Sequence, residues 1–206
     1  MQVSIMGATP APAAVISLAA GNCYGKHDVS EKRIRNCVKA GHTSILEHAS
    51  VTFSIEGVSR ACMAQLTRHR MASFCIESQR YCRYDEEFFN GCEWYVMPPA
   101  FDTFVIDSAM FFDVKMREYA SAYLNAVSSG MKPEDARYLL PEATKTNIVM
   151  TMNLREVFHF WDLRRDKAAQ WEIRNLAEAM ADAMEEDAQL AFFVDLWENK
   201  RDGLDQ

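Results

Sequence analysis

Hydrophobic and polar residues alternate in three short stretches of this chain, which is the pattern of a half-buried β-strand. Val3 and Ile5 alternate with polar neighbours near the start, and residues 144–152 alternate in the second half. The clearest alternation lies at 50–56, where apolar residues at every second position interleave with serine, threonine and glutamate. We predict a strand at each of these three places.

Other segments repeat their apolar residues at helical spacing and carry helix-boundary signals. Ser30 is a candidate N-cap with Gly41 just past the helix end, and Asp166 is a candidate N-cap for a long helix near the C-terminus. Residues 42–48 and 85–100 are predicted as loops. The predicted helices cover 13–20, 29–40, a segment starting at Ser59, 102–129, 133–140, 153–163 and the residues after Asp166. Because the sequence contains no recognisable linker or repeat, the pattern predicts one α+β domain over residues 1–206.

Composition narrows the class of protein. Of 206 residues, 49% are hydrophobic and 25% charged, which is typical of a globular protein. No apolar run reaches the roughly 20 residues that cross a bilayer, and no basic start precedes an apolar stretch as in a signal peptide. The six cysteines are expected to be free thiols in a reducing cytoplasm. We therefore expect a cytoplasmic protein that does not enter a membrane.

The net charge of -7 is unevenly distributed. Nine acids and two bases lie between Glu178 and Gln206, so the rest of the chain is neutral, and we interpret the acidic end as solvated surface. Between Arg60 and Tyr84 there are five arginines and one acid, Glu77. Arginine suits bidentate contacts to phosphate or carboxylate, although clustered arginines can also be plain solvated surface.

Several common site signatures are absent from the sequence. It has no HExxH and no paired CxxC, so no metal site is predicted. No local pattern marks a catalytic cysteine, and there is neither a Walker sequence nor a GxGxxG loop. A bound nucleotide must therefore be held mainly by side chains.

The triplet Arg68-His69-Arg70, followed after seven residues by Ser78, gives the arginine cluster a specific interpretation. This RHR-x7-S pattern resembles the signature of the flavin-dependent thymidylate synthases. Further blocks look like the same family in order and spacing, over about residues 40–175: HTSILEH at 42–48, Gln65, EDAR at 134–137, NLR at 153–155, and LRRD at 163–166 running into AQWEI at 169–173.

The resemblance implies a mixed or antiparallel sheet flanked by helices, in a homotetramer with active sites between subunits. It implies reductive methylation of deoxyuridine monophosphate (dUMP) to dTMP, with FAD as cofactor, 5,10-methylenetetrahydrofolate as carbon donor and NADPH as reductant. Arg164 is the implied catalytic residue, stabilising negative charge on the uracil ring. The implied cofactor-binding residues are Ser44, Arg68, His69, Arg70, Asn153, Leu154, Arg155 and His159. The implied substrate-binding residues are Gln65, Leu66, Thr67, Arg68, Glu77, Ser78, Gln79, Arg80, Arg137 and Arg164.

Two departures from the family pattern concern the flavin. Cys75-Ile76-Glu77 stands where the family commonly has Asn-Glu-x, and Ala168 stands where it often has histidine. One alternative is therefore a non-catalytic nucleotide-binding relative with weakened flavin affinity. Another is an RNA-binding module that uses the Arg60–Tyr84 segment, with Phe74, Tyr81 and Tyr84 as stacking groups; the family resemblance implies no nucleic-acid partner.

Overall fold

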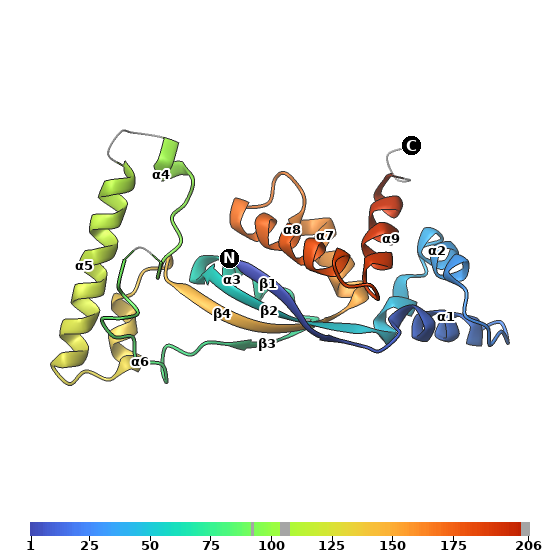
Figure 1. Ribbon diagram of the computed structural model, residues 1–206, viewed down its shortest axis with the longest axis horizontal. Coiled ribbons are helices and arrows are strands. Elements are labelled where there is room, and N and C mark those ends of the chain that lie inside the picture. Colours follow the sequence, from blue (N-terminus) through green and yellow to red (C-terminus); the bar gives the residue numbers. More distant parts are fainter. Residues whose placement is uncertain (92, 104–107, 203–206) are drawn as a thin grey trace. The chain divides into compact units, whose positions relative to one another are not determined.

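The protein is described by a computed structural model that covers residues 1–91, 93–103 and 108–202. Two compact units make up the chain (Figure 1). The first unit comprises residues 1–55, 66–75 and 149–206, and the second unit comprises residues 56–65 and 76–148. Each unit is described below by itself.

A four-stranded sheet runs in the order β1-β2-β4-β3. Its strands are β1 (Gln2–Ala8), β2 (Ser50–Ser59), β3 (Ala72–Ile76) and β4 (Lys145–Asn153). The hydroxyls of Thr52 and Thr151 lie 2.9 Å apart, and the backbone N–H of Gly57 donates to the Asn147 side chain at 3.1 Å. Residue numbers thus rise along β2 while they fall along β4, so this pair is antiparallel. The three predicted strands are confirmed.

Strand β3 was not predicted. Its five residues, Ala72 to Ile76, alternate between half-buried and exposed positions, so neither face carries the fully buried apolar residues that mark β2. In β2, by contrast, Val51, Phe53 and Ile55 are at most 1% exposed. Strand β3 joins the sheet by pairing with β4, and its own sequence gives only a weak strand signal.

Helices cover the sheet in the first unit, which confirms the α+β class (Figure 1). Helix α8 (Trp171–Glu185) packs against β1 and α9 (Ala191–Asp202), and α7 (Leu154–Arg164) packs against α8. The apolar stripe predicted for α8 is buried, from Ile173 to Met184, and Trp161 and Trp197 pack edge to face at 5.5 Å. The elements of this unit are α1 (Pro12–Asn22), α2 (Glu31–Lys39), the 3-10 helix η1 (Thr43–His48), α7 (Leu154–Arg164), α8 (Trp171–Glu185) and α9 (Ala191–Asp202).

Helix boundaries confirm one cap prediction and correct another. The Ser30 hydroxyl accepts the Arg33 backbone N–H at 3.3 Å at the start of α2, as predicted. Asp166 does not cap α8, because the helix begins later and the Gln170 side chain accepts from Glu172 N at 2.8 Å and Ile173 N at 3.2 Å. The predicted loop at 42–48 is also more ordered than expected, since it forms η1.

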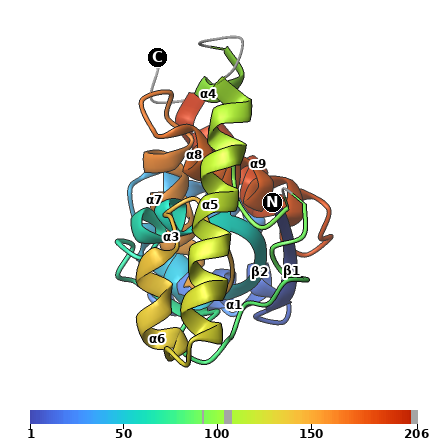
Figure 2. The ribbon, with the colours of Figure 1, turned by 90° about the vertical axis from the view of Figure 1, so that its left-hand side faces the viewer.

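In the second unit, α5 (Ser108–Ser128) lies beside α6 (Pro133–Ala136) (Figure 2). The described residues of 85–99 form no helix or extended strand, in line with the predicted loop, and Ala100 begins α4 (Ala100–Thr103). Aromatic rings of this segment pack into the core, where Phe88 stacks on Tyr84 at 3.8 Å. The helix predicted at 102–129 corresponds to α4 and α5, with residues 104–107 outside the described part. The elements are α3 (Arg60–Leu66), whose last residue belongs to the first unit, α4 (Ala100–Thr103), α5 (Ser108–Ser128), α6 (Pro133–Ala136) and the 3-10 helix η2 (Arg137–Leu139).

Among the described residues, no helix combines the length and the apolar character that crossing a membrane requires. The five cysteines within this part of the chain are free thiols, and Cys92 lies outside it.

Candidate functional site

The arginine-histidine-arginine triplet lies in the turn that follows α3. Its backbone is fixed where the N–H of His69 donates to the Leu66 carbonyl at 3.1 Å, and this places the imidazole inside the first unit at 4% exposure. Asn153 caps α7 by accepting from Glu156 N at 2.9 Å, so Glu156 lies in the first helical turn. The Glu156 carboxylate lies 3.0 Å from His69 Nδ1. Two segments far apart in sequence thus meet at one buried pair.

Arg164, the last residue of α7, approaches the other side of the same ring. Its Nε–H donates to His69 Nε2 at 3.1 Å. A guanidinium can only donate, so Nε2 must accept and the neutral ring carries its proton on Nδ1, where Glu156 accepts it. Burial lowers the pKa of His69 below its usual 6.5, Arg164 lowers it further, and Glu156 acts in the opposite direction. The imidazole is therefore neutral at pH 7.

A cavity of about 280 Å³ lies beside this cluster in the first unit, lined by Glu47, Met71, Asn153, Arg155, Glu156 and His159. The exposed Arg155 is paired with Glu47. The ring of His159 lies 5.9 Å from that of His69. Three predicted cofactor residues, Asn153, Arg155 and His159, therefore line one cavity next to a fourth, His69.

The other predicted cofactor residues vary in their surroundings. Arg68 and Arg70 are exposed and make no hydrogen bond or ion pair with another residue in the described part of the chain, so both cations are available to a ligand. Ser44 is exposed on η1. Leu154 is fully buried, so its side chain belongs to the core and only its backbone could reach a ligand.

The ligand atoms of His69, Glu156 and His159 lie within 4.8 Å of one another, close enough to hold a metal ion. However, Nδ1 of His69 carries the proton shared with Glu156, and the lone pair on Nε2 accepts from Arg164. His69 therefore has no free lone pair for a metal. Glu156, His69 and Arg164 instead form a chain of hydrogen bonds, here called the relay.

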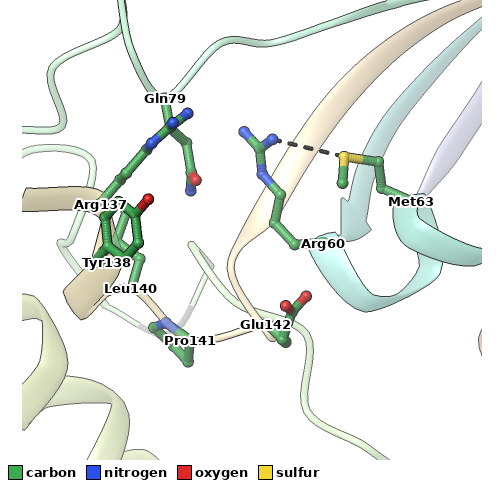
Figure 3. A pocket seen from close by; sticks show the side chains of 8 residues that line it. All are labelled: Arg60, Met63, Gln79, Arg137, Tyr138, Leu140, Pro141 and Glu142. Atoms are coloured by element: carbon green, nitrogen blue, oxygen red, sulfur yellow. Dashed lines mark hydrogen bonds between the residues drawn. The ribbon is translucent and has the colours of Figure 1, made fainter. Parts of the chain in front are cut away.

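The second unit has a separate polar pocket of about 380 Å³. Figure 3 shows the side chains of Arg60, Gln79 and Arg137 facing a common hollow. Arg60 donates through NH2 to the Glu77 carbonyl at 2.7 Å, while its buried Nε has no hydrogen-bond partner. Arg137 is exposed and donates from Nε to the Glu134 carbonyl at 3.0 Å. The pocket suits an anionic group with hydrogen-bonding edges.

Glu77, Ser78 and Arg80, which are also predicted substrate residues of the second unit, already form hydrogen bonds or ion pairs within the protein. The Glu77 carboxylate accepts from the Tyr84 hydroxyl at 3.0 Å and from Asn147 Nδ2 at 2.9 Å. Burial, followed by the nearby Glu77 charge, raises the pKa of Tyr84 to about 12. Arg80 forms an ion pair with Glu134 at 2.8 Å, and the Ser78 hydroxyl accepts from Arg80 N at 3.2 Å.

Around the end of α3, the predicted substrate residues differ in accessibility. Gln65 is half-buried and its Oε1 is buried without a hydrogen-bond partner, an orphaned acceptor that a ligand donor could satisfy. Leu66 is fully buried and Thr67 half-buried. Gln65 belongs to the second unit, and Leu66, Thr67, Arg68 and Arg164 belong to the first. The structure brings the predicted residues together as two separate sets, one in each unit.

Sequence reasoning missed several residues that these sites contain. Glu156 was unmarked because an acid three residues after an N-cap ordinarily indicates a capping box, whereas here it bonds to His69. Arg60 was counted in the arginine cluster but not assigned to a site, and Glu47 was quoted only as part of a motif. Tyr138 carries no local signal, since its place beside the pocket depends on the turn at η2.

Comparison with known proteins identifies the class. A family model described as thymidylate synthase complementing protein matches residues 4–188. Two flavin-dependent thymidylate synthases are similar in sequence: that of Geobacter sulfurreducens is 40% identical over 87% of this chain and 80% of its own, and that of Pyrococcus furiosus is 47% identical over 75% and 62%.

A solved structure has the same fold. Thymidylate Synthase X (ThyX) from Helicobacter pylori, crystallised with FAD and dUMP, aligns with a TM-score of 0.74 at 24% identity over 96% of this chain and 99% of its own. The chain belongs to the flavin-dependent thymidylate synthase family, as the sequence motif indicated.

Proposed function

We propose that this protein methylates dUMP reductively to dTMP, with FAD as cofactor, 5,10-methylenetetrahydrofolate as carbon donor and NADPH as reductant. Family membership over residues 4–188 supports the reaction class. The observation that carries the assignment to this chain is the guanidinium of Arg164, held by His69 at 3.1 Å. Stabilisation of negative charge on a substrate ring requires a donor positioned in this way.

The donor set of the first unit fits a flavin dinucleotide. The exposed guanidiniums of Arg68 and Arg70 have no ion-pair partner among the described residues and suit a pyrophosphate. The cavity at Asn153, Arg155 and His159 offers an amide, a cation and an imidazole. These residues, with Ser44, His69 and the backbone of Leu154, would hold FAD. When bound, FAD supplies hydride chemistry, and the protein supplies binding, orientation and charge.

Both sets contain proposed nucleotide ligands. The orphaned Oε1 of Gln65 matches a donor such as the uracil N–H, and the cations Arg68, Arg80 and Arg137 match a phosphate. The full proposed substrate set is Gln65, Leu66, Thr67, Arg68, Glu77, Ser78, Gln79, Arg80, Arg137 and Arg164. The departures at Cys75, Ile76 and Ala168 leave this set unchanged.

Arg164 would stabilise negative charge as it develops on the uracil ring, which makes carbon 5 of the ring a better nucleophile. The Nε–H is committed to His69, so the terminal NH1 and NH2 groups, which make no hydrogen bond with another described residue, are left for the substrate. A fixed donor costs little reorganisation when charge develops, and this is why a positioned guanidinium is effective.

We also propose a cytoplasmic homotetramer with active sites between subunits. The predicted ligand residues fall into two sets, one in each unit of the chain, and this supports it, because sites shared between subunits use incomplete sets. Light scattering should give four times the chain mass of 23.5 kDa. A monomeric mass would contradict the tetramer.

The test of Arg164 is its replacement. Arg164→Ala should reduce turnover by about 10²- to 10³-fold, the effect of removing one donor aimed at developing charge. The affinity for dUMP should fall much less, because the nucleotide keeps its other contacts. Release of tritium from carbon 5 of labelled dUMP measures turnover, and equilibrium binding measures affinity. Unchanged turnover would show that Arg164 does not activate the ring.

A further inference from the structure

We propose that Glu156 is a positioning residue for Arg164 and acts through His69. This inference rests on the proposed function, because it explains how the guanidinium is aimed at its substrate. Glu156, His69 and Arg164 form a continuous chain of hydrogen bonds of 3.0 Å and 3.1 Å within the first unit. His69, so far a proposed flavin ligand, thereby gains a second role.

The carboxylate selects the tautomer of the imidazole. A neutral histidine has one N–H and one acceptor nitrogen. With the proton on Nδ1, the ring donates to Glu156 and accepts from Arg164, so both contacts are favourable. With the proton on Nε2, an N–H would face the Arg164 N–H and a lone pair would face the carboxylate. Glu156 therefore keeps the Nε2 lone pair directed at Arg164.

Packing holds the ring in this orientation. His69 is 4% exposed, and Phe160 meets its ring edge to face at 4.9 Å. Glu156 is 7% exposed, and its backbone is tied to the Asn153 cap. The ring and the carboxylate are thus rigidly placed, whereas Arg164 is half-buried at the end of its helix. The buried pair of Glu156 and His69 therefore orients the more accessible guanidinium of Arg164.

Charge adds a pH dependence to the relay. The charged or titratable groups that face His69 are Glu156, Arg164 and His159. Once the imidazole gains a second proton, Nε2 becomes a donor and repels the guanidinium. The Glu156 carboxylate favours that protonated form, so its removal should lower the pH at which Arg164 is released.

Two substitutions separate the parts of this proposal. Glu156→Ala removes the acceptor and should lower kcat by about 10- to 100-fold, as misplacement of a reacting group by about 1 Å does. With FAD at saturation, its affinity for dUMP should stay within about threefold of wild type, well below the expected loss in kcat. Glu156→Gln keeps an acceptor oxygen for Nδ1–H and should recover most of kcat, while the acid limb of its pH profile moves to lower pH.

A matched control is Asp162→Asn, a carboxylate-to-amide change on the same helix. Asp162 accepts from Trp197 Nε1 at 2.8 Å and pairs with Lys200 at 3.1 Å, whereas the hydrogen bonds of the His69 ring within the described part of the chain go to Glu156 and Arg164. The acid limb of this variant should coincide with that of wild type. Wild-type kcat in Glu156→Ala, or an unmoved acid limb in Glu156→Gln, would overturn the proposal.

Histidine-selective ¹⁵N NMR tests the relay without any turnover, so its failure can be told from failure of the proposed function. At pH 7.5, His69, assigned by its loss in His69→Gln, should show the neutral Nδ1–H tautomer. In Glu156→Ala the signal should move toward a mixture of tautomers. A wild-type ring protonated on Nε2 would refute the relay, even in a protein that turns over dUMP.

Discussion

A single buried histidine links most of the candidate site in the first unit. The sequence marked His69 as part of a motif, and chemistry favoured a ligand contact. Its hydrogen-bond partners, Glu156 and Arg164, lie 87 and 95 positions away in the sequence. Local patterns could therefore predict neither these contacts nor the burial of the ring. Arginine-rich composition was likewise compatible with an anion site or with solvated surface. It could not indicate that Arg80 binds Glu134, whereas Arg68 and Arg70 have no ion pair within the described part of the chain.

The buried imidazole should make stability depend on pH. Burial is the main reason that the pKa of His69 is lower in the folded protein than the value of about 6.5 expected in the unfolded chain. At a pH between these two pKa values, the unfolded chain binds a proton that the folded chain does not. Its contribution to stability is complete above about pH 6.5 and is lost as the pH falls toward the folded pKa. His69→Gln removes this group, so its melting temperature should fall less than that of wild type between pH 7.5 and 5. Calorimetry measures both, and equal decreases would contradict the neutral buried ring.

At the scale of elements, strongly patterned segments were predictable and tertiary-dependent ones were not. Strand β2 and the buried stripe of α8 followed from their periods. Strand β3 alternates over only five residues and has no fully buried position, so its sequence gives a weak signal, and it joins the sheet by pairing with β4. The start of α8 was misplaced because Asp is the stronger N-cap by propensity, whereas the structure uses Gln170.

Two substitutions can show which residue caps the start of α8. Gln170→Ala removes the acceptor for two backbone N–H groups at the start of α8 and should lower the free energy of unfolding by about 0.5–2 kcal/mol. Asp166→Ala loses one bond, from Ala168 N in an exposed turn, and should cost less. Urea denaturation of both variants measures the two changes. A larger loss for Asp166→Ala would place the functional cap at the predicted position instead.

At the scale of the whole molecule, the family could be recognised from ordered motifs, and the α+β class from alternating and helical periods. The division into two units was not predicted, because no composition shift or linker marks it: β2 and β4 each contribute residues to both units. That the chain acts as one domain over residues 1–206 stays a prediction. The net charge of -7 also gave no hint of anion sites, since the acidic excess lies beyond the matched motifs.

The purified full chain tests the central claim most directly, through release of tritium from carbon 5 of labelled dUMP under anaerobic conditions with NADPH. We predict bound flavin that NADPH bleaches, and tritium release that requires 5,10-methylenetetrahydrofolate. Binding of dUMP without flavin uptake, or flavin that bleaches without any tritium release, would contradict the account that this chain is an active thymidylate synthase.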